Sequence, residues 1–229
     1  MKAWIIVTLS IALLACTDVN QNKTTPDLTE GQSYFLEIAL GSEYGNSAPV
    51  IKKWTSNIRI ALNTSISPEL QKELTKIITE LNQLSRSISI AQVAEPQEAN
   101  VLVFISDAQT YGNYEPNARP YFSENLGFFW VYWKENYAIY KASLYVEESL
   151  DTTCQKHVLR EELTQLLGLM NDSYKYPNSI FYQGWSCTPF YTELDKEVIG
   201  YILNPNIKPG MTRAQLENFF REMNSKAVR

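Results

Sequence analysis

The sequence is poor in histidine, which occurs once among 229 residues, at His157. A catalytic zinc site usually has three protein ligands, most of them imidazoles, and keeps a fourth position open for water. One histidine cannot supply such a set, so the sequence excludes a zinc centre built on several imidazoles. We predict no metal ion and no other cofactor.

An excess of basic residues is also missing. Lysine and arginine number 20 against 25 aspartate and glutamate residues, which gives a formal net charge of -5. No basic stripe with interleaved aromatic residues occurs, so nucleic-acid binding is excluded. The apolar run over residues 3–14 is much shorter than the roughly 20 residues that a membrane-spanning helix needs.

That short apolar run belongs to a signal peptide, which we predict over residues 1–15. Residues 13–16 read Leu-Leu-Ala-Cys and resemble the lipobox of bacterial lipoproteins, whose cysteine is diacylated and becomes the first residue of the mature chain. The resemblance implies a lipid membrane anchor at Cys16 and a place in the bacterial cell envelope. Because Thr17 and not an aspartate follows, analogy favours the periplasmic face of the outer membrane. The alternative is an ordinary signal peptide with a chance cysteine.

Cys154 and Cys187 are the other two cysteines. An exported chain meets an oxidising compartment, in which cysteines pair. We therefore predict a disulfide between them. The alternative is two buried free thiols, because the sequence does not show whether the two backbones approach each other.

The chain divides into a flexible polar tether over residues 16–32 and one domain over residues 33–229. Caps, hydrophobic periodicity and turn residues predict an α+β domain. Its predicted sheet contains an edge hairpin and packs on a long helix and on a second helix that carries the polar motif described below; the C-terminal part is helical. The predicted strands cover residues 57–62, 87–93, 101–105, 128–133 and 137–146. The predicted helices cover residues 68–84 and 192–202 and begin at Thr152 and Thr212, with a surface loop over 108–127 and an irregular stretch over 177–189.

The helix around residues 157–170 contains the most informative polar residues. On a helical wheel, Glu162 falls inside a broad apolar sector, whereas Glu161 and Gln165 lie on its border and His157 lies outside it. A carboxylate in apolar surroundings is costly to ionise. Glu162 is therefore the candidate functional residue. The alternative is a structural glutamate, bonded to the backbone or to a cation such as Arg160, that only holds a loop in place.

Residues 161–171 resemble the extended zincin motif His-Glu-x-x-His-x-x-Gly-x-x-His in frame but not in ligands. The resemblance implies a general base at Glu162 and a turn glycine at Gly168. The three zinc-binding histidines of the motif are replaced, in order, by Glu161, Gln165 and Asn171. Oxygen ligands of this kind, with Asp172, suit calcium, magnesium or manganese better than zinc, so an oxygen-ligated divalent ion is an alternative.

Residues 33–212 as a whole resemble the bacterial domain-of-unknown-function family 2927, a zincin-like group with a degenerate metallopeptidase motif. The matching segments are 34–39, 43–45, 53–54, 161–173, 178–181, 194–195 and 209–211. The resemblance implies a zincin-like fold with an edge strand over a cleft and the Glu-Glu-x-x-Gln helix beneath it. It implies no known activity, since fold does not determine function.

Three functions remain open for the domain. The leading hypothesis is a non-peptidase that binds a peptide or another envelope component, such as an envelope protein, at the sheet edge near residues 137–146. The aromatic candidates for that surface are Tyr111, Tyr114, Trp130, Trp133 and Tyr140. The alternative is that most of these side chains belong to the hydrophobic core. The alternatives are a hydrolase with Glu162 as general base, either metal-free or with an oxygen-ligated ion, and a structural scaffold.

Overall fold

A computed structural model describes residues 27–42, 47–121 and 125–227. The predicted signal peptide, Cys16 and the tether up to residue 26 lie outside the described residues. Helix α1 (Glu30–Leu40) begins inside the predicted tether, so the boundary at residue 32 is wrong. The reason is a reciprocal cap, in which Thr29 accepts from the Gln32 backbone and Gln32 accepts from the Thr29 backbone. Within the described residues, no helix has the length and apolar character needed to cross a membrane.

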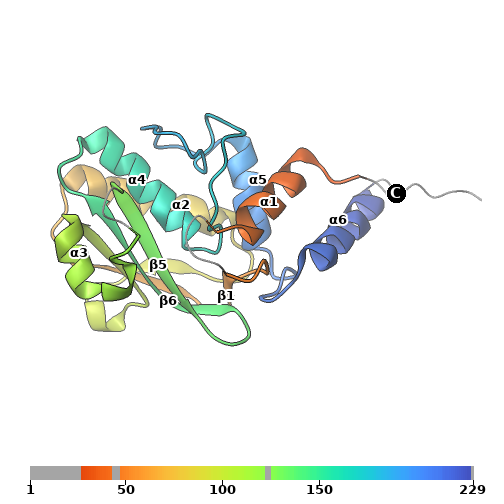
Figure 1. Cartoon of the computed structure of the whole chain (residues 1–229), viewed down its shortest axis with the longest axis horizontal. Helices are drawn as coiled ribbons and strands as arrows, with labels where there is room; N and C mark the ends of the chain where they lie inside the picture. Colours follow the sequence, from red (N-terminus) through yellow and green to blue (C-terminus); the bar gives the residue numbers. More distant parts are fainter. Residues whose placement is uncertain (1–26, 43–46, 122–124, 228–229) are drawn as a thin grey trace, which may run out of the picture.

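The centre of the molecule is a sheet in which most neighbouring strands are parallel (Figure 1). Its strands are β1 (Lys53–Trp54), β2 (Ile58–Leu62), β3 (Ile90–Gln92), β4 (Val101–Ser106), β5 (Gly127–Trp133) and β6 (Ala138–Glu147). The order is β1-β6-β4-β2-β3, and β5 pairs antiparallel with β6. The predicted hairpin and the predicted strands at 57–62 and 101–105 are confirmed, and the predicted strand at 87–93 is shorter.

Strand β6 lies inside the sheet, which corrects the prediction of an edge at residues 137–146. Ile139 pairs with Trp54 of β1 and with Trp133 of β5, so strands flank β6 on both sides. Farther along, β4 lies beside β6 on the side away from β5. The outer member of the hairpin is β5. A hairpin pattern in the sequence predicts two paired strands but not which of the two pairs with the rest of the sheet. The prediction of an edge at residues 137–146 was wrong for this reason.

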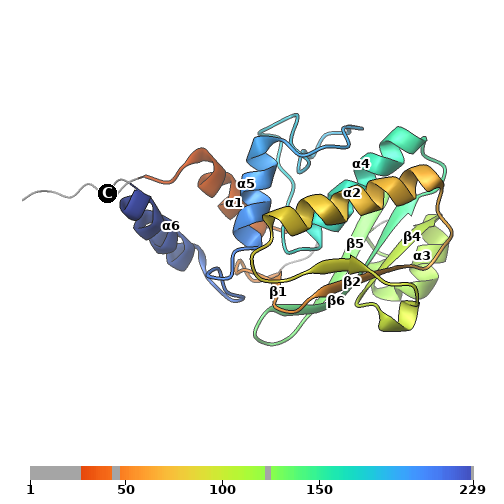
Figure 2. The same cartoon turned by 180° about the vertical axis from the view of Figure 1, so that it is seen from behind.

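Helices cover both faces of the sheet. Helices α2 (Pro68–Leu84) and α4 (Thr152–Gln165) lie side by side on one face, and α3 (Ala108–Tyr114) lies on the other (Figures 1 and 2). Helix α5 (Glu193–Ile202) packs against α1 and α2, and α6 (Arg213–Ala227) packs against α1. The chain thus folds as one mixed domain of helices and sheet, and the predicted helices at 68–84 and 192–202 are confirmed.

Residues 108–118 form α3 and a short 3-10 helix, η2 (Pro116–Ala118), and not the predicted surface loop. Asp107 caps α3 by accepting from the Thr110 backbone at 2.6 Å. Tyr111 is fully buried in a second small core with Phe104 and Tyr145. The glycine, asparagine and proline content of this segment indicated a loop, but one buried tyrosine and an aspartate cap outweigh that composition.

Helix α4 is buried around nearly its whole circumference. It begins at the predicted Thr152, and its cap is Asp151. The wheel placed His157 outside the apolar sector, yet its exposed fraction is 4%. Arg160 is also fully buried, because it meets two glutamates of α2. Helix α2 at Arg160 and the loop at Ser186 and Thr188 beside His157 therefore cover the polar side that the sequence pattern assigned to solvent.

The C-terminal end of α4 turns sharply at Gly168. This residue has φ +118°, and an added Cβ would lie 1.9 Å from the backbone oxygen of Lys52. Only glycine combines that φ with so close a backbone approach. The predicted turn glycine is thus placed where the chain requires one. The indole of Trp54 donates to the Leu166 carbonyl at 2.9 Å and satisfies part of the helix end.

Candidate functional site

A cavity of about 280 Å³ opens between the start of β5, one side of α4 and the segment 182–186. Strand β5 contributes Gly127 and Phe129 to its wall, and α4 contributes His157, Glu161, Glu162 and Gln165. The cavity therefore joins segments that lie far apart in the sequence: the outer strand of the sheet, the polar motif of α4 and an irregular loop.

Glu162 lies in the cavity wall with an exposed fraction of 7%. Strand β5 reaches this part of α4 because residue 127 is glycine. A Cβ at Gly127 would lie 2.2 Å from Cγ1 of Val158 and 2.6 Å from Oε1 of Glu162, distances that no side chain tolerates. The glycine thus allows the outer strand to approach the helix directly over the Glu162 carboxyl.

The other motif positions separate into two groups. Glu161 and Gln165 line the cavity with Glu162, and the side-chain amide of Gln165 donates to the Asp172 carboxylate. Asn171 does not belong to the described lining of the cavity. Its backbone N–H donates to the Ile38 carbonyl at 3.2 Å and its side chain donates to the backbone oxygen of Asp172 at 2.8 Å. The structure thus brings Asp172, and not Asn171, to the site.

His157 joins the helix to the irregular loop. Its Nδ1 lies 3.0 Å from the Thr188 carbonyl, which only accepts, so Nδ1 carries the proton. Its Nε2 lies 3.2 Å from the Ser186 hydroxyl and 3.4 Å from the Glu161 carboxylate. Burial alone would lower the pKa of His157, but the hydrogen bond and charge of Glu161, together with the Thr188 carbonyl, raise it above its usual value.

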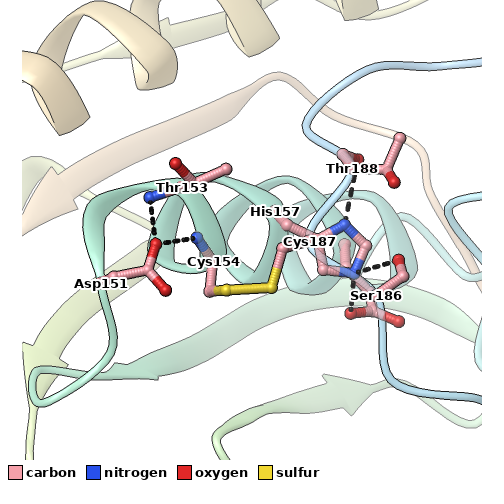
Figure 3. Close-up of a disulfide and its surroundings, with 8 residues drawn as sticks. Asp151, Thr153, Cys154, His157, Ser186, Cys187 and Thr188 are labelled. Carbon is pink, nitrogen blue, oxygen red and sulfur yellow. Dashed lines mark hydrogen bonds and ion pairs between the residues drawn. A yellow bond between two sulfur atoms is a disulfide. The ribbon is translucent and has the colours of Figure 1, made fainter.

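The predicted disulfide is present between Cys154 and Cys187, with the two Cα atoms 4.5 Å apart. Figure 3 shows it one helical turn before His157, with Ser186 and Thr188 on the same loop around the imidazole. Two successive turns of α4 therefore hold the loop, one by a covalent bond and one by hydrogen bonds. This double attachment positions the wall of the cavity that lies opposite β5.

The described residues contain no group of three or more histidine, cysteine, aspartate or glutamate side chains arranged to hold a metal ion. Glu161, Glu162 and Asp172 line one cavity but do not form such a group.

The aromatic candidates lie apart from the cavity, and none of the five is among its described lining residues. Tyr111 belongs to the second core, and Tyr114 and Trp130 pack against it. Trp133 and Tyr140 have exposed fractions of 39% and 46%. The lining aromatics of the loop are Tyr182 and Trp185, which the sequence did not indicate because an irregular segment has no periodicity from which a facing direction follows.

The family model described as "Protein of unknown function (DUF2927)" matches residues 29–222. The chain belongs to this family. Its description assigns no activity, and no curated protein matches the sequence.

Two solved structures of myroilysin resemble the fold in part. "Structure of Myroilysin" has a TM-score of 0.42 and 12% identity, and covers 68% of this chain and 83% of its own. "Crystal structure of myroilysin" has a TM-score of 0.33 and 13% identity, and covers 82% of this chain and 80% of its own.

Proposed function

We propose that the domain binds an extended peptide segment of an envelope protein, which adds to the sheet as a further strand beside β5. The observation that carries the proposal is the position of the outer strand β5 directly over the cavity that contains Glu162. Among the described residues, no strand pairs with the side of β5 that faces away from β6.

The hydrogen-bonding direction of β5 supports this proposal. The Leu126 carbonyl accepts from the Glu147 backbone, and the Ala142 backbone donates to Asn100 on the opposite side of β6. Backbone groups alternate in direction along an antiparallel strand. The N–H and C=O groups of Gly127, Phe129 and Val131 therefore point away from β6, where an incoming strand finds its partners.

We interpret this arrangement as a zincin-like cleft without zinc. The outer antiparallel strand β5 lies over helix α4, in which Glu162 occupies the general-base position of the zincin motif. Carboxylate and amide side chains occupy the positions of the zinc-binding histidines. In this interpretation the cleft binds an extended peptide chain and does not cleave it. Binding energy then comes from main-chain hydrogen bonds and from one side chain in the cavity.

A hydrolase that uses Glu162 as general base, metal-free or with an oxygen-ligated divalent ion, is the second candidate, and the position of Glu162 favours it. A carboxyl group with an exposed fraction of 7% in a cavity wall is suited to a general base. Glu162→Gln keeps the shape of the side chain and removes the base. A folded variant that loses hydrolysis of envelope proteins but keeps peptide binding would establish the hydrolase, and loss of stability alone would indicate a scaffold.

We also propose that Cys16 anchors the mature protein to a membrane through acyl chains, as residues 13–16 suggest. Labelling of growing cells with a palmitate analogue tests this. The wild-type chain should incorporate the label and fractionate with membranes, and a Cys16→Ser variant should do neither. Membrane fractionation of the unlabelled variant would contradict a lipid anchor at this residue.

Strand addition can be tested with peptides methylated on their backbone nitrogens. Two sets of the same capped pentapeptides carry the methyl groups on the odd or on the even residues, and affinity is measured by fluorescence anisotropy. A strand donates to its neighbour only from alternate residues, so one set should lose binding and the other should keep it. Equal affinities of the two sets would contradict strand addition.

A second measurement locates the binding edge. Amide hydrogen exchange should slow at Gly127, Phe129 and Val131 when an unmethylated peptide binds, because the peptide covers the outer edge of β5. The backbone amides of Trp133 and Tyr140, at the far end of the hairpin, serve as the reference, and their exchange rates should not change. Protection confined to the loop 182–188 would place the ligand elsewhere.

A further inference from the structure

We infer that the cavity selects a lysine or arginine side chain of the bound peptide. This inference rests on the proposed strand addition and specifies the ligand of the same site. It depends on three properties of the cavity: the charge of its lining, its volume, and the mixture of apolar and aromatic groups beside the carboxylates.

The charge of the described lining is strongly unbalanced. Glu161, Glu162 and Asp172 contribute three carboxylates, and the lining contains no lysine and no arginine. The one basic group is His157, which already lies 3.4 Å from Glu161. The described lining therefore contains three carboxylates and one imidazole. A cationic ligand group complements that charge.

Burial makes this charge effective at short range. The exposed fraction of Glu162 is 7%, and that of the Glu161 side chain is 16%. Attraction between opposite charges is stronger where little water separates them, and a hydrogen bond between charged groups is stronger than a neutral one. The cavity therefore favours an ammonium or guanidinium group over a neutral group and disfavours a carboxylate.

The volume fits one long side chain. Sites for drug-sized ligands span roughly 300–1,000 Å³, whereas this cavity has about 280 Å³. Phe129 and Val158 provide apolar surface for a methylene stem, along which lysine and arginine side chains pack while their charged ends reach polar groups. The indole of Trp185, with an exposed fraction of 61%, belongs to the loop wall of the cavity and suits a cation over its face.

Three pools of capped pentapeptides test the inference on the wild-type protein. Their flanking residues vary, and the central residue is lysine, norleucine or glutamate. The lysine pool should bind about 10-fold or more tightly than the norleucine pool, as expected when a charged hydrogen bond is added. The glutamate pool should bind more weakly than both. The advantage of the lysine pool should decline as salt is added.

Two variants with the same change of charge locate the effect. Glu162→Gln should bring the ratio of the lysine-pool affinity to the norleucine-pool affinity close to one, and circular dichroism of the variant shows that it is folded. Glu69→Gln changes an exposed glutamate near the start of α2 and should leave both affinities unchanged.

The outcomes separate the inference from the proposed function. Equal binding of the lysine, norleucine and glutamate pools would overturn the basic specificity and leave strand addition intact. Absence of binding by all three pools would overturn both. Loss of the lysine advantage in Glu69→Gln to the same degree as in Glu162→Gln would show that net charge and not the cavity attracts the peptide, and would also overturn the inference.

Discussion

The two sides of α4 use charged residues in opposite ways. On the side toward α2, the guanidinium of Arg160 lies 3.1 Å from Glu73 through Nε, also pairs with Glu80, and stacks 4.4 Å from the centre of the Tyr191 ring. On the side toward β5, Glu161 and Glu162 line a cavity. The first side is closed by packing, and the second remains accessible to a ligand.

This difference separates residues that stabilise the fold from residues that are available for recognition. Burying an ion pair costs desolvation free energy. The pair matters for stability mainly because removing one partner leaves the other charge buried and unpaired, which is strongly destabilising. A carboxylate in a cavity wall has the same burial cost but keeps room beside it for a cation. Changes on the Arg160 side should therefore affect unfolding, whereas changes on the Glu162 side should affect binding.

Arg160→Met should have the largest effect on stability. The change removes the cation beside Glu73, whose exposed fraction is 7%, and leaves its carboxylate buried. We expect the free energy of unfolding in urea to fall by about 3–5 kcal/mol. Adding Glu73→Leu to the variant should recover much of this loss. A loss of less than about 1 kcal/mol for Arg160→Met would contradict a structural role for the pair.

Removal of the disulfide should reduce both stability and binding. The bond joins residues 33 positions apart, and breaking it frees the loop that forms one wall of the cavity. We expect Cys154→Ala with Cys187→Ala to lower the free energy of unfolding by about 2–4 kcal/mol. Peptide affinity should also fall, unlike in a folded Arg160 variant. Unchanged affinity would show that the loop does not belong to the binding site.

Gly127→Ala should separate β5 from α4. The added methyl group has no room between Val158 and Glu162, so we expect a loss of about 1–3 kcal/mol in unfolding and weaker peptide binding. Gly200→Ala is the matched control, because its Cβ meets no atom within 4 Å inside α5. That change should raise stability by about 0.5–1 kcal/mol. Equal effects of the two changes would contradict the close contact at β5.

The smallest expected effect is the pH dependence that His157 causes. Its pKa is raised above 6.5 in the folded protein, since Glu161 and the Thr188 carbonyl outweigh burial. The protonated imidazole therefore adds stability in full below about pH 6.5, and this stability is lost as pH rises through the folded pKa. The free energy of unfolding, measured against pH, should be higher for the wild type than for His157→Gln below about pH 6.5. The two values should approach each other as the pH rises through the folded pKa of His157. A difference in the free energy of unfolding that does not change with pH would contradict the ion pair between His157 and Glu161.

Local features of the sequence predicted most of the regular elements. Ser67 and Pro68 mark the start of α2, and Thr192 begins α5 with a capping box that includes Asp195. These predictions hold because a cap bonds to groups within three residues of itself. Alternating residues likewise predicted β2, since its two faces meet different surroundings.

Features that depend on distant packing were not predictable in the same way. The segment 108–118 contains loop-forming residues but forms α3 because Tyr111 enters a core with Phe104 and Tyr145. Strand β6 is internal because β1 and β4, which precede it in the chain, pair on its other side. Neither partner is visible from the hairpin itself.

The candidate site was predictable only in part. The wheel indicated Glu162 among apolar residues, and the motif frame grouped it with Glu161 and Gln165, which line the same cavity. Asn171 falls outside because the chain turns at Gly168 toward α1. The loop residues Trp185 and Ser186 join the site through a disulfide, and nothing in their local sequence indicates that role.

The sequence by itself determined the scarcity of imidazole, the family, the caps and the periodicity of the main helices. Only the tertiary structure decided which charged residues of α4 are closed off and which face a cavity. The physical reason is that burial depends on what packs against a side chain, and the groups that cover this helix come from α2, β5 and the loop after residue 181, all distant in the chain.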